Sequence, residues 1–164
     1  MLVVMSLKTK IRVDRRDSRF SAAHFLADMG KCERLHGHNY FVAVEAQGQP
    51  DERGVVLDFN LLEPAIAAAC APLDHKVLIA GNSPSIQLRE NGAELEIGFK
   101  QKRYVMPKED CVILPLSSTS VESLSGYLLE KILERLGPAG ARLEWIEVGV
   151  SEGGTQTAYT KKDF

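Results

Sequence analysis

The sequence predicts an α+β fold with the element order β-β-α-α-β-β, in which an antiparallel sheet carries the two helices on one face, and an extra β-hairpin segment between the two helices. Three observations predict it: strand-like runs early in the chain, two amphipathic segments with helix caps, and a closing apolar run. The chain has 164 residues, which suits a single domain over residues 1–164 with a sizeable core.

The first strands are predicted from runs that are rich in β-branched and aromatic residues. They are expected near Thr9–Val13 and Arg19–Phe25, and a third is expected over Tyr40–Gln47. Residues 49–54 contain Pro, Asp and Gly, so a turn is predicted there.

Capping residues mark both predicted helices. In the first, Asn60 is the expected N-cap with Glu63 as its capping partner, and the helix stops before Pro72. In the second, Thr119 and Glu122 form the expected capping box, and a Gly-Pro pair ends the helix. Apolar residues of the second helix recur at helical spacing, at Val121, Leu124, Leu128, Ile132 and Leu136.

The segment between the helices, residues 76–117, contains short strand-like runs. These lie near Ile86–Arg89, Glu94–Phe99 and Arg103–Met106, and the Asn-Gly pair at 91–92 predicts a hairpin turn. We expect a surface meander, which could lie near the rim of an active site.

The last predicted strand, Arg142–Ser151, carries apolar residues on both faces. Ile146, Val148 and Val150 share one face, while Leu143 and Trp145 share the other. A strand that is apolar on both faces needs cover on both. The helices can cover one face, so another subunit is expected to cover the second.

Composition excludes several classes of protein. The formal net charge is −2 and the pI is about 6.1, so there is no basic footprint for nucleic acid. No apolar run approaches the length of a membrane span. The three cysteines show no disulfide framework, which suits a reducing compartment. We therefore expect a cytoplasmic protein.

Three of the four histidines lie within fifteen residues. His36 and His38 are two residues apart on a predicted strand and so project from one face, and His24 ends the preceding predicted strand. If the two strands pair, the three imidazoles can converge on one zinc ion and leave its fourth position open. The alternative is that these histidines are solvated, or satisfied within the core.

Cys32 lies in the loop between these strands, flanked by Lys31 and Arg34. Positive neighbours lower the pKa of a thiol, which favours a reactive thiolate beside the metal. The thiol could instead be a fourth ligand that closes the zinc site and makes it structural. The residues leave both interpretations open.

These motifs resemble the 6-pyruvoyl-tetrahydropterin synthase and 6-carboxytetrahydropterin synthase family. The most specific piece is Cys32-x-x-x-His36-Gly37-His38 with an upstream Phe-Ser-Ala-Ala-His that ends in His24. Further matches follow in order along the chain, at 55–59, 73–75, 120–122 and 152. The resemblance covers nearly the whole chain except residues 76–117, which are longer than expected.

The resemblance implies a tunnelling fold, in which the sheets of three subunits join into a barrel and two trimers stack into a hexamer. It implies that the zinc ligands are His24, His36 and His38. Cys32 is implied to be the catalytic base, and Asp74 and His75 a proton relay contributed across a subunit boundary. Glu152 is implied to anchor the pterin ring of the substrate, 7,8-dihydroneopterin triphosphate.

The implied activity is that of a zinc-dependent lyase with one of two products. The first possibility is 6-carboxytetrahydropterin, formed with release of acetaldehyde and triphosphate on the path to queuosine-type deazapurines. The second is 6-pyruvoyl-tetrahydropterin, formed by triphosphate elimination on the path to biopterin. A third hypothesis is a non-enzymatic module whose structural zinc site is closed by one cysteine and three histidines. The residues of the motif from Cys32 to His38 look closer to those of the 6-carboxytetrahydropterin branch, so we favour that product.

Overall fold

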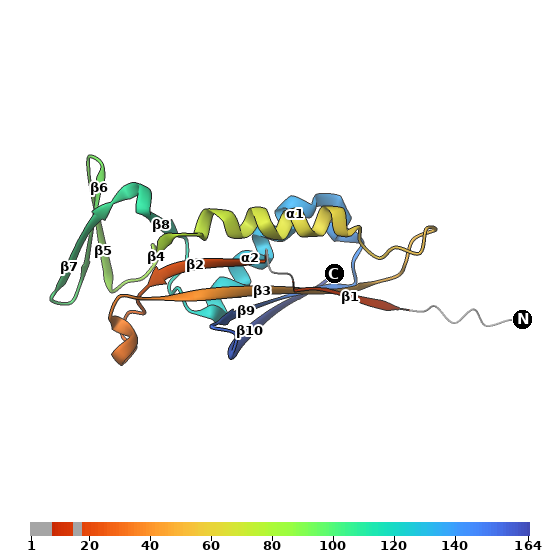
Figure 1. The fold of residues 1–164 in the computed structure, drawn as a ribbon, viewed down its shortest axis with the longest axis horizontal. Helices are drawn as coiled ribbons and strands as arrows, with labels where there is room; N and C mark the ends of the chain where they lie inside the picture. The colour runs from red at the N-terminus through yellow and green to blue at the C-terminus, as the bar shows by residue number, and fades with distance from the viewer. Residues whose placement is uncertain (1–7, 15–17) are drawn as a thin grey trace, which may run out of the picture.

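The computed structural model of the chain describes residues 8–14 and 18–164. Its two sheets and two helices form the mixed α+β arrangement drawn in Figure 1. The strands are β1 (Thr9–Val13), β2 (Arg19–His24), β3 (His36–Gly48), β4 (Lys76–Ala80), β5 (Ile86–Asn91), β6 (Glu94–Phe99), β7 (Lys102–Pro107), β8 (Cys111–Leu114), β9 (Trp145–Glu152) and β10 (Gln156–Asp163). The helices are α1 (Phe59–Cys70) and α2 (Val121–Leu136).

The long strand β3 organises the main sheet, whose order is β10-β9-β3-β2-β4-β8. β2 pairs with the first part of β3 and β1 with the last part, both antiparallel. The prediction of an antiparallel sheet is wrong in part, because β4 pairs parallel with β2 and β8 pairs parallel with β4. Both extra strands come from the segment between the helices, where the sequence predicted only a surface meander.

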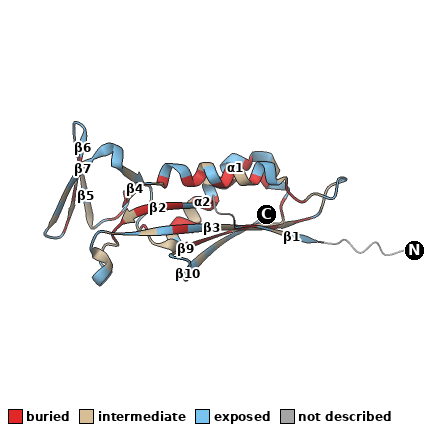
Figure 2. Cartoon of the chain, in the orientation of Figure 1, coloured by how far each residue is buried: buried red, intermediate tan, exposed pale blue. Residues whose placement is uncertain are grey.

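The main core lies between this sheet and the two helices. Tyr40, Val42, Val44 and Ala46, which alternate along β3, are all buried. α2 packs on β9 and β10, and α1 packs on α2. Figure 2 shows the buried side of α1 turned toward the sheet. No helix of the described part of the chain is long and apolar enough to cross a membrane.

Both predicted helices exist, but their starts differ from the prediction. α1 begins at Phe59 because the carboxylate of Asp58, not Asn60, is the N-cap, and it accepts a hydrogen bond of 2.8 Å from the Asn60 amide. The N-cap of α2 is Ser120, whose side chain makes no capping hydrogen bond. The predicted capping box at Thr119 is therefore wrong, since that residue contacts His24 instead.

The three strands predicted between the helices are confirmed as a separate sheet in the order β5-β6-β7. Gly92 takes a left-handed φ of 58° in the first turn, as the hairpin signal predicts. One face of this inserted sheet carries its own small core, in which Leu95, Ile97 and Phe99 pack with Phe25 and Ile79. The inserted sheet stands at one end of the molecule in Figure 1.

The last predicted strand begins later than expected, at Trp145, because residues 137–142 form a 3-10 helix. Leu143 precedes the strand and is buried in the main core. Trp145 is half-buried, with the Lys161 ammonium 5.0 Å from its ring centroid. The prediction that this strand is apolar on both faces is therefore wrong, and it no longer argues for a second subunit.

Candidate metal centre

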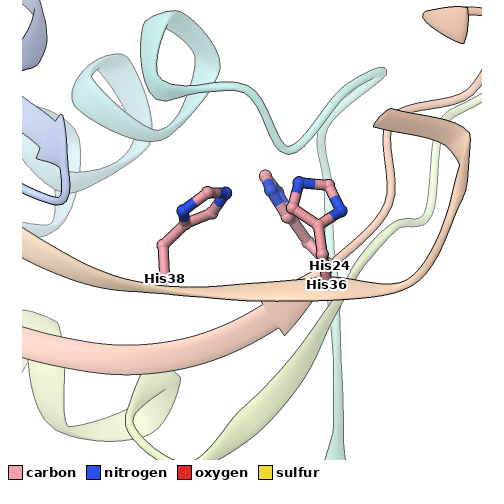
Figure 3. Close-up of side chains that lie close together, drawn as sticks. All are labelled: His24, His36 and His38. Atoms are coloured by element: carbon pink, nitrogen blue, oxygen red, sulfur yellow. The ribbon is translucent and has the colours of Figure 1, made fainter. Parts of the chain in front are cut away.

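The three histidines continue the core face of the sheet. The alternation that buries Val42 and Tyr40 places His38 and His36 on the same side of β3. His24 is paired with His36 in the antiparallel β2–β3 ladder. Figure 3 shows the three rings on one side of the β3 ribbon. The ladder therefore gathers imidazoles where the apolar core ends.

One nitrogen from each ring can reach a common point. The three potential ligand atoms of His24, His36 and His38 lie within 4.8 Å of one another. His24 is fully buried, whereas the side chain of His38 is 27% exposed. The cluster could thus hold a metal ion that is closed to solvent on one side and open on the other.

Hydrogen bonds to carbonyl groups orient two of the rings. Nδ1 of His24 lies 3.1 Å from the carbonyl oxygen of Thr119, and Nδ1 of His36 lies 2.6 Å from that of Arg34. A carbonyl only accepts, so each Nδ1 carries a proton, and in the neutral ring Nε2 keeps its lone pair. Such outer contacts are typical of metal-binding histidines. A set of three neutral imidazoles fits zinc.

Burial lowers the pKa of His24 to about 4. The hydrogen bond to Thr119 opposes this lowering of the pKa, while electrostatic interaction with His36 and His38 adds to it. His24 is therefore neutral at neutral pH. A metal ligand must be neutral imidazole, so burial prepares this ring to bind.

Tyr40 is a contact of the cluster that the sequence did not reveal. Its hydroxyl lies 3.2 Å from Nδ1 and 3.3 Å from Nε2 of His24, and the two rings are nearly perpendicular. Burial, and to a lesser degree the charge of Glu152, raise the pKa of Tyr40. The phenol therefore stays protonated against the His24 ring.

Glu152 ends β9 opposite Tyr40 and points at the histidines. Its two carboxylate oxygens lie 3.8 Å from Nε2 of His24 and 3.8 Å from Nε2 of His38. Gly153 follows with a left-handed φ of 59° and donates its amide hydrogen to the carbonyl of Asn39. This turn fixes the carboxylate at the mouth of the cluster.

Cys32 lies in a short 3-10 helix, Gly30–Glu33, and is partly exposed. It lines a cavity of about 540 Å³ together with the three histidines and Glu152. A thiol, a carboxylate and a potential metal site therefore share one cavity.

Asp74 and His75 form a pair on a different surface. Oδ2 of Asp74 lies 2.8 Å from Nδ1 of His75, and Oδ1 accepts a 2.8 Å hydrogen bond from the Ser21 amide. That amide is the main reason why the pKa of Asp74 is lowered; the desolvation of its carboxyl opposes the shift, and His75 adds to it. The side chain of His75 is 84% exposed and borders a second cavity of about 590 Å³. His38 lines both cavities, but within one chain neither Asp74 nor His75 lines the cavity of Cys32.

Most of the sequence is similar to that of a known protein family. Residues 13–163 match the family profile described as 6-pyruvoyl tetrahydropterin synthase. A protein of Methanocaldococcus jannaschii, provisionally named a 6-carboxy-5,6,7,8-tetrahydropterin synthase, is 33% identical over 146 residues, which cover 88% of this chain and 90% of that one. The 6-carboxy-5,6,7,8-tetrahydropterin synthase of Bacillus subtilis is 28% identical over 116 residues, 69% of this chain and 65% of that one.

Solved structures agree with the sequence comparison. The 6-pyruvoyl tetrahydropterin synthase of Plasmodium vivax superposes with a TM-score of 0.91 at 30% identity, covering 96% of this chain and 99% of that one. The enzyme of that name from Caenorhabditis elegans has a TM-score of 0.64 at 18% identity over 96% of this chain and 97% of that one, and shares the fold.

Proposed function

Since the chain belongs to the 6-pyruvoyl tetrahydropterin synthase family, we propose that it is a zinc-dependent lyase acting on 7,8-dihydroneopterin triphosphate. The product we propose is 6-carboxy-5,6,7,8-tetrahydropterin, formed with uptake of one water and release of acetaldehyde and triphosphate, in a queuosine-type deazapurine pathway. The observation that carries the proposal is the single cavity shared by the three histidines, Cys32 and Glu152. The free state of all three cysteines supports work in a reducing cytoplasm.

The proposed zinc ligands are the Nε2 atoms of His24 and His36 and a ring nitrogen of His38. Zinc held there would lower the pKa of substrate hydroxyl groups and polarise a developing carbonyl. The fully buried His24 fixes the inner side of the site, and the partly exposed His38 leaves the outer side for the substrate.

Glu152 is the proposed anchor of the pterin ring. The amino group of a pterin and its neighbouring ring N–H form a pair of donors, and a carboxylate accepts from both in two parallel hydrogen bonds. Glu152 is 21% exposed and faces the cavity from the end of β9. Its position beside the histidines would hold the side chain of the substrate over the metal.

Cys32 is the proposed base that removes a proton from the carbon next to the developing carbonyl. One solved variant of the Plasmodium vivax enzyme is described as a catalytic-residue mutant with alanine in place of a glutamate, so in that protein a carboxylate matters. In this chain a carboxylate also lies next to Cys32, that of Glu33. Its oxygen lies 2.6 Å from Nζ of Lys100, and Cys32, not Glu33, lines the cavity. We therefore assign the proton transfer to the thiol.

Asp74 and His75 are the proposed proton relay, supplied by a neighbouring subunit. Asp74 orients the His75 ring through the 2.8 Å contact, as an aspartate orients a catalytic histidine in hydrolases. Their separation from Cys32 within one chain fits a site that is completed across a subunit boundary. We propose a trimer whose sheets form a barrel, with two trimers stacked as a homohexamer.

The sister reaction, which gives 6-pyruvoyl-tetrahydropterin, is the second candidate, because the structural neighbours carry that name. The curated relatives carry the name of the carboxy product instead. Incubation of the purified protein with zinc and dihydroneopterin triphosphate, followed by mass analysis, separates the two. Acetaldehyde with 6-carboxytetrahydropterin supports our proposal, 6-pyruvoyl-tetrahydropterin supports the sister reaction, and unchanged substrate rejects both.

A non-enzymatic protein, with a closed zinc site made of one cysteine and three histidines, is the third candidate. X-ray absorption at the zinc edge tests it, since a sulfur ligand lies at about 2.3 Å and nitrogen ligands at about 2.0–2.1 Å. A sulfur neighbour would favour the closed site. Three nitrogens with one lighter, exchangeable ligand would favour the enzyme.

A further inference from the structure

The loop that carries Cys32 joins β2 to β3 over residues 25–35. Three main-chain hydrogen bonds hold it internally: the Leu26 amide donates to the Cys32 carbonyl at 2.8 Å, the Cys32 amide to that of Met29 at 3.2 Å, and the Arg34 amide to that of Lys31 at 3.3 Å. Asp28 and Gly30 both take left-handed φ values, of 61° and 60°. None of the residues in its 3-10 helix is buried. Contacts from outside the loop therefore bear on the position of the Cys32 thiol.

The turn between β6 and β7 of the inserted sheet reaches this loop. Nζ of Lys100 lies 2.6 Å from a carboxylate oxygen of Glu33 and 3.1 Å from one of Asp28. Nζ of Lys102 donates to the main-chain carbonyl of Glu33 at 2.6 Å. The hydroxyl of Ser85 also donates to Asp28, at 2.7 Å. The inserted sheet therefore binds the loop on both sides of Cys32.

The inserted sheet is itself anchored beside the metal cluster. Phe25, which follows His24, packs on Phe99 with ring centroids 5.6 Å apart and on Tyr104 at 5.8 Å. Phe25 and Phe99 are both buried. Lys100 in the turn and Lys102 at the start of β7 thus lie beside a small core that includes Phe25, the neighbour of the proposed zinc ligand His24.

Exposed ion pairs contribute little to the free energy of folding, so any effect of these contacts on the reaction must come from the geometry that they impose. The Glu33 carboxylate is only 19% exposed, and the hydrogen bond from Lys102 goes to a main-chain atom next to Cys32. A contact of this kind acts on the position of the backbone. A shift of about 1 Å in a reacting group can lower a rate by about a hundredfold.

We propose that Lys100 and Lys102 are positioning residues, which clamp the loop of residues 25–35 so that the Cys32 thiol faces the cavity. The proposal assigns a role in the reaction to the inserted sheet, and it rests on the proposed function of Cys32. The clamp acts on the thiol; the proposed zinc ligands lie outside the loop, in β2 and β3, and the Arg34 carbonyl of the loop contacts His36.

The test compares Lys100→Met/Lys102→Met with the conservative Lys100→Arg/Lys102→Arg. Arg103→Met is the matched control, because Arg103 pairs with Glu96 at 2.6 Å within the inserted sheet. Four quantities are measured: hydrogen exchange of the Leu26 amide, the rate at which iodoacetamide alkylates Cys32, zinc content, and kcat and KM on dihydroneopterin triphosphate.

In the methionine variant, the Leu26 amide exchanges about tenfold faster, and kcat falls about tenfold with KM changed less than about twofold. The alkylation rate of Cys32 changes, while zinc stays stoichiometric. The arginine variant recovers most of kcat, and Arg103→Met behaves as wild type. If the methionine variant fails to fold, Lys102→Met alone gives the same readouts.

Wild-type exchange and alkylation in the methionine variant would overturn the clamp, and so would an equal effect of Arg103→Met. Zinc loss would also overturn it, because the lysines would then support the metal site. A wild-type protein that leaves the pterin unchanged rejects the proposed function, whereas exchange and alkylation still decide on the clamp.

Discussion

The Oε2 atom of Glu152 lies 3.8 Å from the Nε2 atom of His38. This distance exceeds that of a direct hydrogen bond, so the carboxylate lies near the imidazole without forming a hydrogen bond to it. The other oxygen lies equally far from Nε2 of His24. The carboxylate therefore keeps its lone pairs for a substrate while it sits beside two proposed zinc ligands.

Glu152→Gln should weaken pterin binding. One oxygen of the carboxylate becomes an amide donor that faces the donors of the ring, so a charge-assisted hydrogen bond worth about 2 kcal/mol is lost and Kd rises about thirtyfold. Calorimetry with the pterin measures Kd, and the zinc content serves as the control. Unchanged affinity would reject the anchoring role.

Cys32→Ala should lose turnover and keep both fold and zinc. Removal of a general base lowers a rate by about a hundredfold to ten-thousandfold. Single-turnover assays and metal analysis check this, with Cys111→Ala as the control because Cys111 packs against the small core of the inserted sheet. If zinc leaves with the thiol, Cys32 is a ligand and the site is closed.

His36→Ala should strip the metal, since two imidazoles seldom hold zinc without further protein ligands. After dialysis, metal analysis should find almost no zinc in this variant. His75→Ala is the matched control and should keep full zinc, because its side chain is 84% exposed and borders the other cavity. Stoichiometric zinc in His36→Ala would contradict the ligand set.

A mixture of Cys32→Ala and His75→Ala subunits should regain activity that neither variant has alone. If each site takes its thiol from one subunit and its relay from the next, random co-assembly restores about one quarter of the sites. Co-expression with two affinity tags, followed by an activity assay, measures this. No recovery would mean that both groups act within one chain.

The metal-free protein should lose stability in mild acid. His24 has its pKa lowered from 6.5 to about 4, so the unfolded chain binds a proton that the folded chain does not. The contribution of His24 to the free energy of unfolding is therefore fully present above pH 6.5, and about 3 kcal/mol of it is lost as the pH drops to about 4.

Urea unfolding in the presence of a chelator measures this loss. His24→Gln should flatten the dependence between these two pH values, and His75→Gln should preserve it. An equally steep loss in His24→Gln would assign the effect to other groups.

Most of the fold followed from local signals in the sequence. Alternation in β3, helical spacing in α2 and the Asn-Gly turn between β5 and β6 each lie within one segment, and each is confirmed. β4 and β8 were missed because their pairing is parallel and reaches across the chain, and a short apolar run does not reveal its partner.

The grouping of the three histidines could be predicted because they belong to one pair of strands. The contact of Thr119 with His24 could not, since its segment is distant in sequence and its own local pattern suggested a helix cap. The contacts of Lys100 and Lys102 with the Cys32 loop could not be predicted either, because they also join segments that are distant in sequence. Local patterns place residues on faces, but only packing decides which faces meet.

The pairing of β2 with β3 also bears on the order in which the chain folds. This one hairpin brings His24, His36 and His38 together, whereas the Thr119 carbonyl that orients His24 and the carboxylate of Glu152 come from segments far along the chain. Contacts close in sequence form early, and those that close long loops form late. In the enzyme that we propose, the metal ligands would therefore come together before the substrate anchor, and zinc would favour productive folding.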